Sequence, residues 1–353
     1  MLIAVTADLH LDKDHPETYG YFKKFIEQLK QQQITTVILA GDIFAKQAAS
    51  YPDFVKLLNQ YPDITFHAVK GNHDNHLKKK MFALNNFYLY DEPVLKKISN
   101  RHFVFIPYYA DRSMAEVYRE YFSEPPPSNS VLISHGDWQA SSFDPGVTYE
   151  NNYFLLTRGD LQQMNISKVI LGHIHKPESF DSQQRVIYCG SPWPVSVNET
   201  GFHYYLLYDA AAAVWTYKQT GDCPLYERQT MFVIPEQAAE LEHKVNSYMQ
   251  SLQQQYDSAF TRLHVKLTVK GYTDEDTKAL NRKLEELLQQ YCDKKHFTLD
   301  TAAVIYNEDI RLTALTRKAE SYLQRFSSAE LVYGVEADDI KQQMLHFIYG
   351  EPS

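Results

Sequence analysis

The sequence predicts a mixed α/β fold divided into two domains, residues 1–233 and residues 234–353. In the first domain, short apolar runs rich in Val, Ile, Leu and Thr alternate with short helical stretches, which is typical of strands and helices packed in layers. The chain of 353 residues also exceeds the roughly 100–200 residues that one domain usually contains. Pro235 is well placed to start an amphipathic helix, PEQAAELEHKVNSYMQSLQQQYD, and marks the division.

Five apolar runs of the first domain end in clusters of Asp, Asn and His, and each run predicts a strand followed by a loop. The runs are LIAVTADLH, TTVILAGD, TFHAVKGNHD, SVLISHGD and SKVILGHIH. The clusters are Asp8 with His10, Asp42, Asn72 with His73 and Asp74, His135, and His173 with His175. Because α/β sheets present ligands at the carboxyl ends of their strands, we expect these side chains to gather along one sheet edge.

The end of the first domain predicts three further stretches of strand. RVIYCGS, FHYYLLYDAAAAVWTYKQT and ERQTMFVIP are apolar or alternating runs, bounded by turn-forming residues. We expect them to lie in succession and to close the sheet of the first domain.

The residue types in the five clusters indicate a metal site. Carboxylate, amide oxygen and imidazole are hard-to-borderline ligands that suit Mn, Fe or Zn. Their number permits two divalent ions about 3.5–4 Å apart with one bridging carboxylate, for which we expect Asp42. Glycines at 41, 71, 136 and 172 leave room for the backbone to turn beside the ligands, where a Cβ would crowd the approach. Each motif alone is weak, but five in one chain favour a two-metal site.

His73 and Asp74 are the candidate catalytic residues. His73 follows the ligand Asn72 and would stand outside both sets of ligands, so it could stabilise a pentavalent transition state or protonate the leaving oxygen. Asp74 could set the tautomer of His73. The other histidines are interpreted as surface or core side chains, although His76 lies close enough to the GNHD motif to touch a substrate.

The motifs DxH, GD, GNHD, H and GHIH, in this order, resemble the signature of the calcineurin-like metallophosphoesterases over about residues 1 to 200. Within that superfamily, DLHL, GDIF, GNHD, GHIH and YCGSP look like the SbcD-type DNA repair exonucleases. The resemblance implies a two-sheet β-sandwich flanked by helices and, as the usual ion, manganese. It also implies the distribution of the ligands: Asp8, His10, Asp42 and His175 on one ion, and Asp42, Asn72, His135 and His173 on the other.

The second domain resembles, by its position and length, the capping domain of SbcD-type nucleases. After the helix at Pro235, its sequence predicts a strand in FTRLHVKLTVKG, a helix that starts near Thr273, a strand in HFTLDTAAVIYNE and further helices. An apolar stripe near the end comprises Leu331, Val332, Ile340, Met344, Leu345, Phe347 and Ile348. Such a stripe packs in a core or, as the resemblance implies, docks on an SMC-like ATPase of the SbcC type.

Three functions remain open: a manganese-dependent DNA exonuclease or endonuclease, a phosphodiesterase or phosphatase for a small molecule such as a cyclic nucleotide, and a scaffold without catalysis. The retained ligands argue against the scaffold. The net charge of −9 weakens a DNA substrate, because nucleic-acid binders usually carry a basic surface. The LKKK stretch at 77–80 could supply positive charge beside the metal site.

The remaining expectations concern location and assembly. The chain shows neither the pattern of a signal peptide nor an apolar run near the roughly 18 residues of a membrane span, so a cytoplasmic protein is expected. Three cysteines are too few for a disulfide framework. The resemblance also implies a homodimer formed through helices of the first domain, at residues 75–90 and 112–122.

Overall fold

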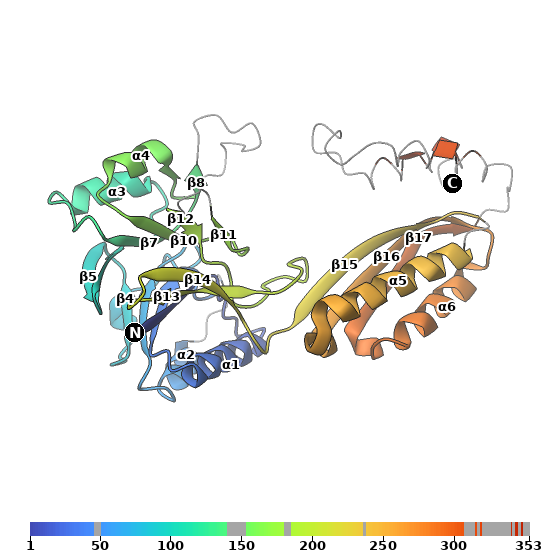
Figure 1. The fold of residues 1–353 in the computed structure, drawn as a ribbon, viewed down its shortest axis with the longest axis horizontal. Helices are drawn as coiled ribbons and strands as arrows, with labels where there is room; N and C mark the ends of the chain where they lie inside the picture. Colours follow the sequence, from blue (N-terminus) through green and yellow to red (C-terminus); the bar gives the residue numbers. More distant parts are fainter. Residues whose placement is uncertain are drawn as a thin grey trace. The chain divides into compact units, whose positions relative to one another are not determined.

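The computed structural model describes residues 1–45, 51–139, 153–179, 185–235 and 238–306, together with eight separate residues between 315 and 348. By their contacts the residues form two compact units. The first unit comprises Met1–Ser196 and Phe202–Cys223, and the second comprises Val197–Gly201 and Pro224–Ser353. Figure 1 shows both units as ribbons and labels most of their helices and strands.

The first unit contains two six-stranded sheets. The first sheet has the order β14 (Val214–Gln219), β13 (Tyr204–Asp209), β1 (Leu2–Thr6), β2 (Thr36–Ala40), β3 (Thr65–Val69), β4 (Phe87–Tyr90). The second has the order β11 (Glu178–Ser179), β12 (Val186–Tyr188), β10 (Lys168–Gly172), β7 (Val131–His135), β6 (Arg101–Phe105), β5 (Val94–Ile98). Because β1, β2 and β3 are mutually parallel, as are β7 and β10, their carboxyl ends lie together within each sheet.

The two sheets pack face to face around a buried apolar core. Ile3 and Ile38 of the first sheet share this core with Phe105, Ile133 and Ile170 of the second. Burial of one such side chain contributes roughly 1.5–3 kcal/mol. Since side chains alternate along a strand, the opposite face of each sheet is left for helices to cover.

Helices cover the outer face of each sheet. α1 (Glu17–Gln31) and α2 (Tyr51–Leu58) pack on the first sheet, with Phe22 and Phe54 in a separate core on its outer face. α3 (Met114–Tyr121) and α4 (Arg158–Gln163) pack on the second sheet with Val117 and Leu161. The result confirms the predicted β-sandwich flanked by helices (Figure 1).

Both short helices on the second sheet begin at a capping box. Ser113 Oγ accepts a hydrogen bond from the Glu116 amide at 3.3 Å, and Thr157 Oγ1 accepts one from the Asp160 amide at 3.1 Å. Caps of this kind typically contribute about 1 kcal/mol. They fix where these helices start, after the small strands β8 (Trp138–Gln139) and β9 (Leu156–Thr157) in the case of α4.

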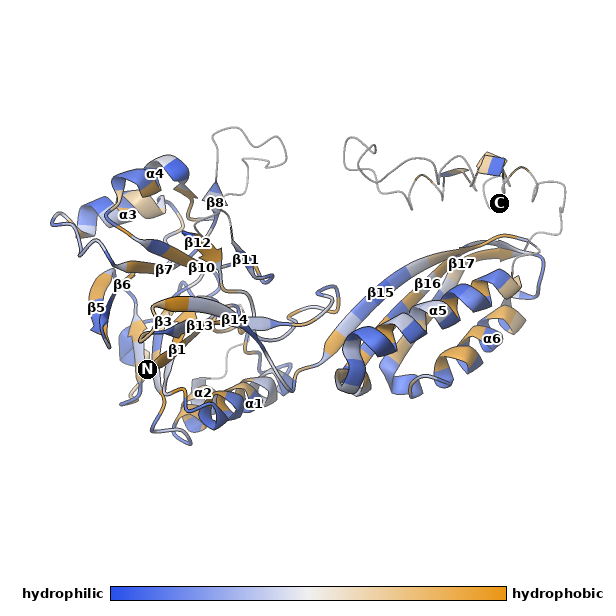
Figure 2. Ribbon diagram, in the orientation of Figure 1, coloured by the Kyte–Doolittle hydropathy of each residue, from blue (hydrophilic) through white to orange (hydrophobic). Residues whose placement is uncertain are grey.

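The second unit contains a parallel three-stranded sheet in the order β15 (Leu225–Val233), β16 (Leu263–Thr273), β17 (Phe297–Tyr306). Two helices connect the strands: α5 (Ala238–Tyr256) and α6 (Thr277–Gln289), with 3₁₀ turns at Asp257–Arg262 and Lys294–His296. Both helices lie on the same face of the sheet (Figure 1) and carry hydrophobic and hydrophilic residues side by side (Figure 2). The predicted helix after Pro235 and the strand, helix, strand order after it are confirmed.

The strands near the end of the first predicted domain join three different sheets, so the expectation that they close one sheet was wrong. β12 lies in the second sheet, β13 and β14 form a hairpin at the edge of the first, and β15 pairs with β16 in the third. β15 is paired over its whole length, from Leu225 opposite Leu263 to Val233 opposite Gly271. Alternating apolar residues predict a strand but carry no information about its neighbour.

The contact division falls between Cys223 and Pro224, whereas the sequence placed the boundary between residues 233 and 234. That the two units fold as separate domains stays a prediction. Residues 75–90 were expected to be helical, but they contain the 3₁₀ turn Lys79–Met81 and most of them are not helix, while residues 112–122 contain α3.

The apolar stripe near the end of the chain lies outside the described residues, apart from Ile340, Met344, Phe347 and Ile348. Its helix and its docking role therefore stay predictions. Among the described helices, none is both long enough and apolar enough to cross a membrane.

Candidate metal centre

The five polar clusters lie at the carboxyl ends of strands from both sheets. Asp8, Asp42 and Asn72 follow β1, β2 and β3 of the first sheet, whereas His135 ends β7 and His173 follows β10 of the second. The prediction of one sheet edge was therefore wrong. The residues come together where the strand ends of two packed sheets meet, which lets ligands approach from two sides.

The backbone at four of the predicted site residues adopts positive φ: 56° at Asp8, 43° at His10, 48° at Asp42 and 98° at His173. Residues with a Cβ avoid this region, and holding one there typically costs about 1–3 kcal/mol. Hydrogen bonds between the first two loops stabilise it, because the Asp8 amide donates to Gly41 O at 3.0 Å and the His10 amide donates to Asp42 O at 3.1 Å. The local backbone strain is therefore tolerated at four residues whose side chains belong to the proposed site.

Two glycines leave the room that the sequence predicted. A Cβ on Gly71 would lie 2.1 Å from Asp42 Oδ1, and a Cβ on Gly172 would lie 2.3 Å from Ala40 O. Both distances are far below van der Waals contact, so any larger residue would displace Asp42 or separate the two sheets at the site.

Asp42 lies at the centre of the cluster with its side chain 3% exposed. Its Oδ2 is 3.4 Å from His135 Nε2, 3.9 Å from His10 Nε2 and 4.0 Å from His73 Nε2. Its Oδ1 accepts a hydrogen bond from the His73 amide at 2.9 Å. A carboxylate that faces donors on several sides has the position expected of a bridging ligand.

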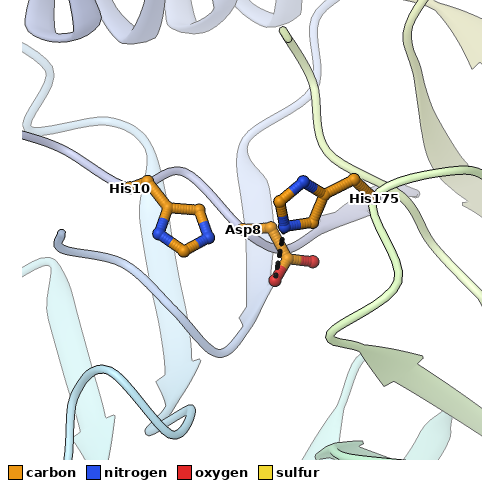
Figure 3. A group of neighbouring side chains, drawn as sticks. All are labelled: Asp8, His10 and His175. Atoms are coloured by element: carbon orange, nitrogen blue, oxygen red, sulfur yellow. Dashed lines mark ion pairs between the residues drawn. The ribbon is translucent and has the colours of Figure 1, made fainter. Parts of the chain in front are cut away.

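Asp8 is fully buried and lies close to His10 and His175, with which it forms one group of possible metal ligands (Figure 3). The distance from Asp8 Oδ1 to His175 Nε2 is 3.8 Å, and one ligand atom from each of the three residues lies within 4.8 Å of the others. The same holds for two further groups: His10, Asp42 and His73, and Asp8, Asp42 and His135. The three groups overlap, so the donors form one continuous cluster.

His135 brings Asn72 into the cluster. His135 Nδ1 lies 2.9 Å from the Ala40 carbonyl oxygen and Nε2 lies 3.0 Å from Asn72 Oδ1. Because a carbonyl oxygen only accepts, Nδ1 is the donor to Ala40. This arrangement turns Nε2 toward Asn72 and Asp42, with the His135 side chain fully buried.

His173 lies at the margin of the cluster. Its amide donates to Asp8 Oδ2 at 3.1 Å, and its ring centroid is 5.4 Å from that of His135. Its Nε2 faces Asp137 Oδ1 at 3.6 Å, and among the described residues it belongs to none of the three metal-holding groups. The sequence analysis missed Asp137, although the Gly-Asp pair after β7 repeats the pattern that had identified Asp42.

Asp74 has a structural task. Its carboxylate is fully buried and accepts hydrogen bonds from the amides of Ile43, Phe44 and Gly71, at 2.9, 3.2 and 3.2 Å. In the described part of the chain His73 Nδ1 is buried and makes no hydrogen bond. The expectation that Asp74 sets the tautomer of His73 therefore finds no hydrogen bond to support it, and Asp74 instead ties the second and third loops together.

The charges of the cluster are strongly perturbed. Burial raises the pKa of Asp8 to about 6 and lowers the pKa of His10 to about 4. Burial acts on Asp42 and His135 as well, but their attraction outweighs it, so the pKa of Asp42 falls below its ordinary value and the pKa of His135 rises to about 9. Burial and the nearby charge of Asp42 raise the pKa of Asp74 to about 7. Groups perturbed in this way concentrate at functional sites.

These side chains fit divalent cations. Within the described ranges, the ion pairs to Asp8 and Asp42 all come from histidines, with none from Lys or Arg. His10 Nε2 is buried without a hydrogen-bond partner among the described residues, and such an atom ordinarily has one. A cation would satisfy this nitrogen and the buried carboxylates together, and the oxygen and imidazole donors suit Mn, Fe or Zn.

Residues 1–177 match the model of the family described as calcineurin-like phosphoesterase, which is half of the 353-residue chain. The chain belongs to this family. Calcineurin-like phosphoesterases use divalent metals to hydrolyse phosphate esters, in agreement with the donor cluster at the sheet ends.

The chain is also similar to the SbcD component of the nuclease SbcCD from Staphylococcus saprophyticus, with 28% identity over 57% of this chain and 63% of the relative. It therefore spans less than two thirds of that relative. Among solved structures, a novel archaeal phosphodiesterase has 16% identity, covers 62% of this chain and 99% of its own, and gives a TM-score of 0.34. A dimetal phosphatase from Danio rerio has 13% identity, covers 59% and 91%, and gives a TM-score of 0.37.

Proposed function

We propose that this phosphoesterase is a two-metal phosphodiesterase. The more specific proposal is a manganese-dependent DNA nuclease of the SbcD type that acts in DNA repair. The observation that carries the proposal is the continuous donor cluster, in which Asp8, His10 and Asp42 each belong to two of the three overlapping groups. A single ion would need only one of these groups. Because the groups share carboxylates, the cluster has the ligands for two neighbouring ions with a carboxylate between them.

The proposed ligands are those that the motifs predicted. Asp8, His10, Asp42 and His175 would hold one ion; Asp42, Asn72, His135 and His173 would hold the other. The bound ions would supply Lewis-acid stabilisation of the phosphate and a water that ionises near neutral pH. Asp42 is the shared ligand, because its Oδ2 faces histidines from both sheets.

His73 is the proposed proton donor. Its side chain is 35% exposed, whereas those of Asp42 and His135 are 3% and 0% exposed, so it is the member of this trio that a substrate can reach. The hydrogen bond from its amide to Asp42 Oδ1 holds its backbone against the centre. From there the imidazole can give a proton to the leaving oxygen of a phosphodiester. Asp74 supports this position indirectly, by fixing the loop that carries His73.

The proposal of DNA as substrate rests on the similarity to SbcD, a component of a nuclease, and on the extra strand–helix–strand unit after the phosphoesterase fold. Exposed lysines at 78, 79 and 80, a few residues after the GNHD motif, offer positive charge for a phosphate backbone. We extend the proposal to an SMC-like ATPase partner, a homodimer and a cytoplasmic location, all by the same similarity.

A small-molecule phosphodiesterase or phosphatase is the second candidate. The observation that favours it is the net charge of −9, because the phosphate backbone of DNA dominates the affinity of most DNA-binding proteins through basic residues. A cyclic nucleotide or a nucleotide conjugate would need far fewer positive contacts than a duplex.

The deciding experiment is to incubate the purified chain and manganese with labelled single-stranded and double-stranded DNA and, separately, with bis-p-nitrophenyl phosphate. His73→Ala and Asp42→Ala are compared with His15→Ala, a matched control because the His15 side chain is 68% exposed and, among the described residues, forms an ion pair with Glu17 alone. We expect cleavage of both substrates by the wild type and by His15→Ala, and loss of both in the other two variants.

Turnover of the small diester without DNA cleavage, in the chain alone and with an ATPase partner added, would favour the small-molecule enzyme. No turnover of either substrate with manganese, iron or zinc would contradict the two-metal assignment itself.

A further inference from the structure

Among the histidines of the centre, His173 has a partner of its own. His10, His135 and His175 each direct Nε2 toward Asp8 or Asp42, at distances of 3.4 to 3.9 Å. His173 instead directs Nε2 toward Asp137 Oδ1, at 3.6 Å. Because Asp137 is outside the proposed ligand set, this contact needs a separate explanation.

The Asp137 carboxylate is fixed in place by its surroundings. Its Oδ2 accepts a hydrogen bond from the Tyr153 amide at 2.8 Å, and its own amide donates to Tyr153 O at 2.8 Å. Its carbonyl oxygen accepts from the Leu156 amide at 2.9 Å, next to the pairing of β8 with β9. With one oxygen hydrogen-bonded and the backbone tied on both sides, the other oxygen, Oδ1, faces His173.

Tyr153 restrains the same imidazole from a second direction. Its ring centroid lies 5.0 Å from that of His173, with an angle of 48° between the ring planes. The His173 backbone is held by hydrogen bonds from its amide to both oxygens of Asp8. The ring thus contacts a carboxylate and an aromatic ring, and its backbone is held by the buried carboxylate of Asp8.

We propose that Asp137 is a positioning residue, which holds His173 in the tautomer with the proton on Nε2 and so leaves the lone pair of Nδ1 to a cation of the centre. The contact of 3.6 Å between His173 Nε2 and Asp137 Oδ1 is longer than a hydrogen bond. A neutral imidazole has one donor and one acceptor nitrogen, and a carboxylate can only accept, so this neighbour favours the proton on the nitrogen that faces it. Carboxylates commonly orient metal-binding histidines in this way. The inference rests on the proposed metal centre.

An acceptor also orients His135, but there it faces Nδ1 rather than Nε2. There the Ala40 carbonyl oxygen faces Nδ1 at 2.9 Å and leaves Nε2 to the centre. His135 and His173 would therefore present different nitrogens, one oriented by a backbone carbonyl and the other by a side chain. Only the second orientation can be removed by mutation without altering the backbone.

The first test uses the metal-free full-length chain labelled with ¹⁵N at histidine. Long-range ¹H–¹⁵N spectra report the tautomer of His173, whose signals are assigned by their absence in His173→Gln. We expect the Nε2–H form in the wild type and in the control Asp63→Ala, whose side chain is exposed, and a mixture of both forms in Asp137→Ala. An Nδ1–H tautomer in the wild type, or an unchanged spectrum of His173 in Asp137→Ala, would overturn the proposal.

The second test measures manganese binding by titration calorimetry. Loss of a residue that orients a ligand typically weakens metal affinity about 10–100-fold. We expect Asp137→Ala to weaken one of two manganese ions by this factor, and Asp137→Asn to weaken it less, because the amide oxygen of Asn can still accept from Nε2. Asp63→Ala should bind as the wild type does.

The two tests separate the possible failures. A wild type that binds no manganese would overturn the proposed metal centre and, with it, the role of Asp137 toward a cation. A wild type that binds two ions, with Asp137→Ala binding them equally well, would overturn the role of Asp137 alone.

Discussion

Both units of the chain place parallel strands side by side and join them through helices, but the strand ends differ. In the first unit, β1 and β2 end at loops that bury Asp8 and Asp42. In the second unit, β15 is followed by the buried apolar residue Ile234, and β16 ends at Thr273, whose hydroxyl accepts from the Glu275 amide just before α6. In the second unit, the end of β16 leads into a helix. In the first unit, the strand ends carry buried titratable side chains.

The difference shows what a buried polar centre requires. An uncompensated buried carboxylate costs several kcal/mol, and one sheet edge alone leaves such a group open to water. Where two sheets pack face to face, their strand ends enclose the group from both sides, and histidines of the second sheet face carboxylates of the first. The single sheet of the second unit has no partner sheet among the described residues, and its strand ends hold no comparable cluster.

The largest expected effect is the loss of turnover when a buried charge of the first unit is removed. Asp8→Asn should lower turnover of bis-p-nitrophenyl phosphate about 1000-fold, equivalent to roughly 4 kcal/mol, because it removes the charge of a proposed ligand. The thermal unfolding midpoint of the metal-free protein should not fall, since burial already raises the pKa of Asp8 to about 6 and so disfavours its charged form. Asp63→Asn serves as the surface control, and retained turnover in Asp8→Asn would count against Asp8 as a ligand.

The next effect should be confined to the second unit. Leu284 is fully buried on α6, and Leu284→Ala should reduce the free energy of unfolding by about 2–5 kcal/mol through the cavity it leaves. Hydrogen exchange should rise in α6, β16 and β17, while turnover of the small diester is unchanged.

The reciprocal variant is Leu29→Ala on α1 of the first unit, where the side chain is equally buried. It should increase exchange in the first sheet and not in the third. Exchange that rises in both units with either variant would show that they unfold as one domain, against the predicted two-domain organisation.

Acid should act on His67, a partly buried histidine of the first unit that lies outside the centre. His67 Nδ1 shares a hydrogen bond with the Tyr90 hydroxyl at 2.8 Å, and burial lowers the pKa of His67 to about 4. The unfolded chain, with a histidine pKa near 6.5, then binds the extra proton, so stability falls as pH drops from about 6.5 to 4, by up to ~3 kcal/mol.

Urea unfolding of the wild type and of His67→Phe across this pH range provides the measurement. The variant should lose the Tyr90 hydrogen bond at pH 7 but show a shallower decline toward pH 4. An identical decline in both proteins would exclude His67 as the source of this acid sensitivity. Burial also lowers the pKa of His264 in the second unit, which is less buried, so His264→Phe should change the decline less.

The smallest effect compares two glycines in close contact with a neighbour. A Cβ at Gly71 would lie 2.1 Å from Asp42 Oδ1, and a Cβ at Gly271 would lie 2.2 Å from Val233 O. Gly71→Ala should weaken manganese binding about tenfold, equivalent to roughly 1.4 kcal/mol, by displacing a ligand. Gly271→Ala should leave manganese binding unchanged and lower only the stability of the second unit. Equal manganese affinity in the two variants would contradict the central place of Asp42.

Much of the candidate centre could be predicted from the sequence, because its residues follow strands that are themselves recognisable. Polar, titratable side chains directly after an apolar run seldom serve to pack a core, so they stand out as functional candidates. Their order along the chain gave the resemblance to the phosphoesterases. Asp137 was missed because its only signal was a Gly-Asp pair, and Asp74 was given a partner that the structure does not provide. Both errors concern which atoms meet across loops that are distant in sequence.

The strands, the helix after Pro235, the glycines beside Asp42 and the residue types of the proposed ligands could be predicted from the sequence, since each depends on local backbone preferences and side-chain chemistry. The tertiary structure alone decided that β12, β13 and β15 join three different sheets and that the site lies between two sheets rather than along one. The physical reason is that strand alternation specifies which face is buried, whereas the choice of neighbour depends on contacts between residues far apart in the chain, such as Val5 with Leu206 and Gly172 with His135.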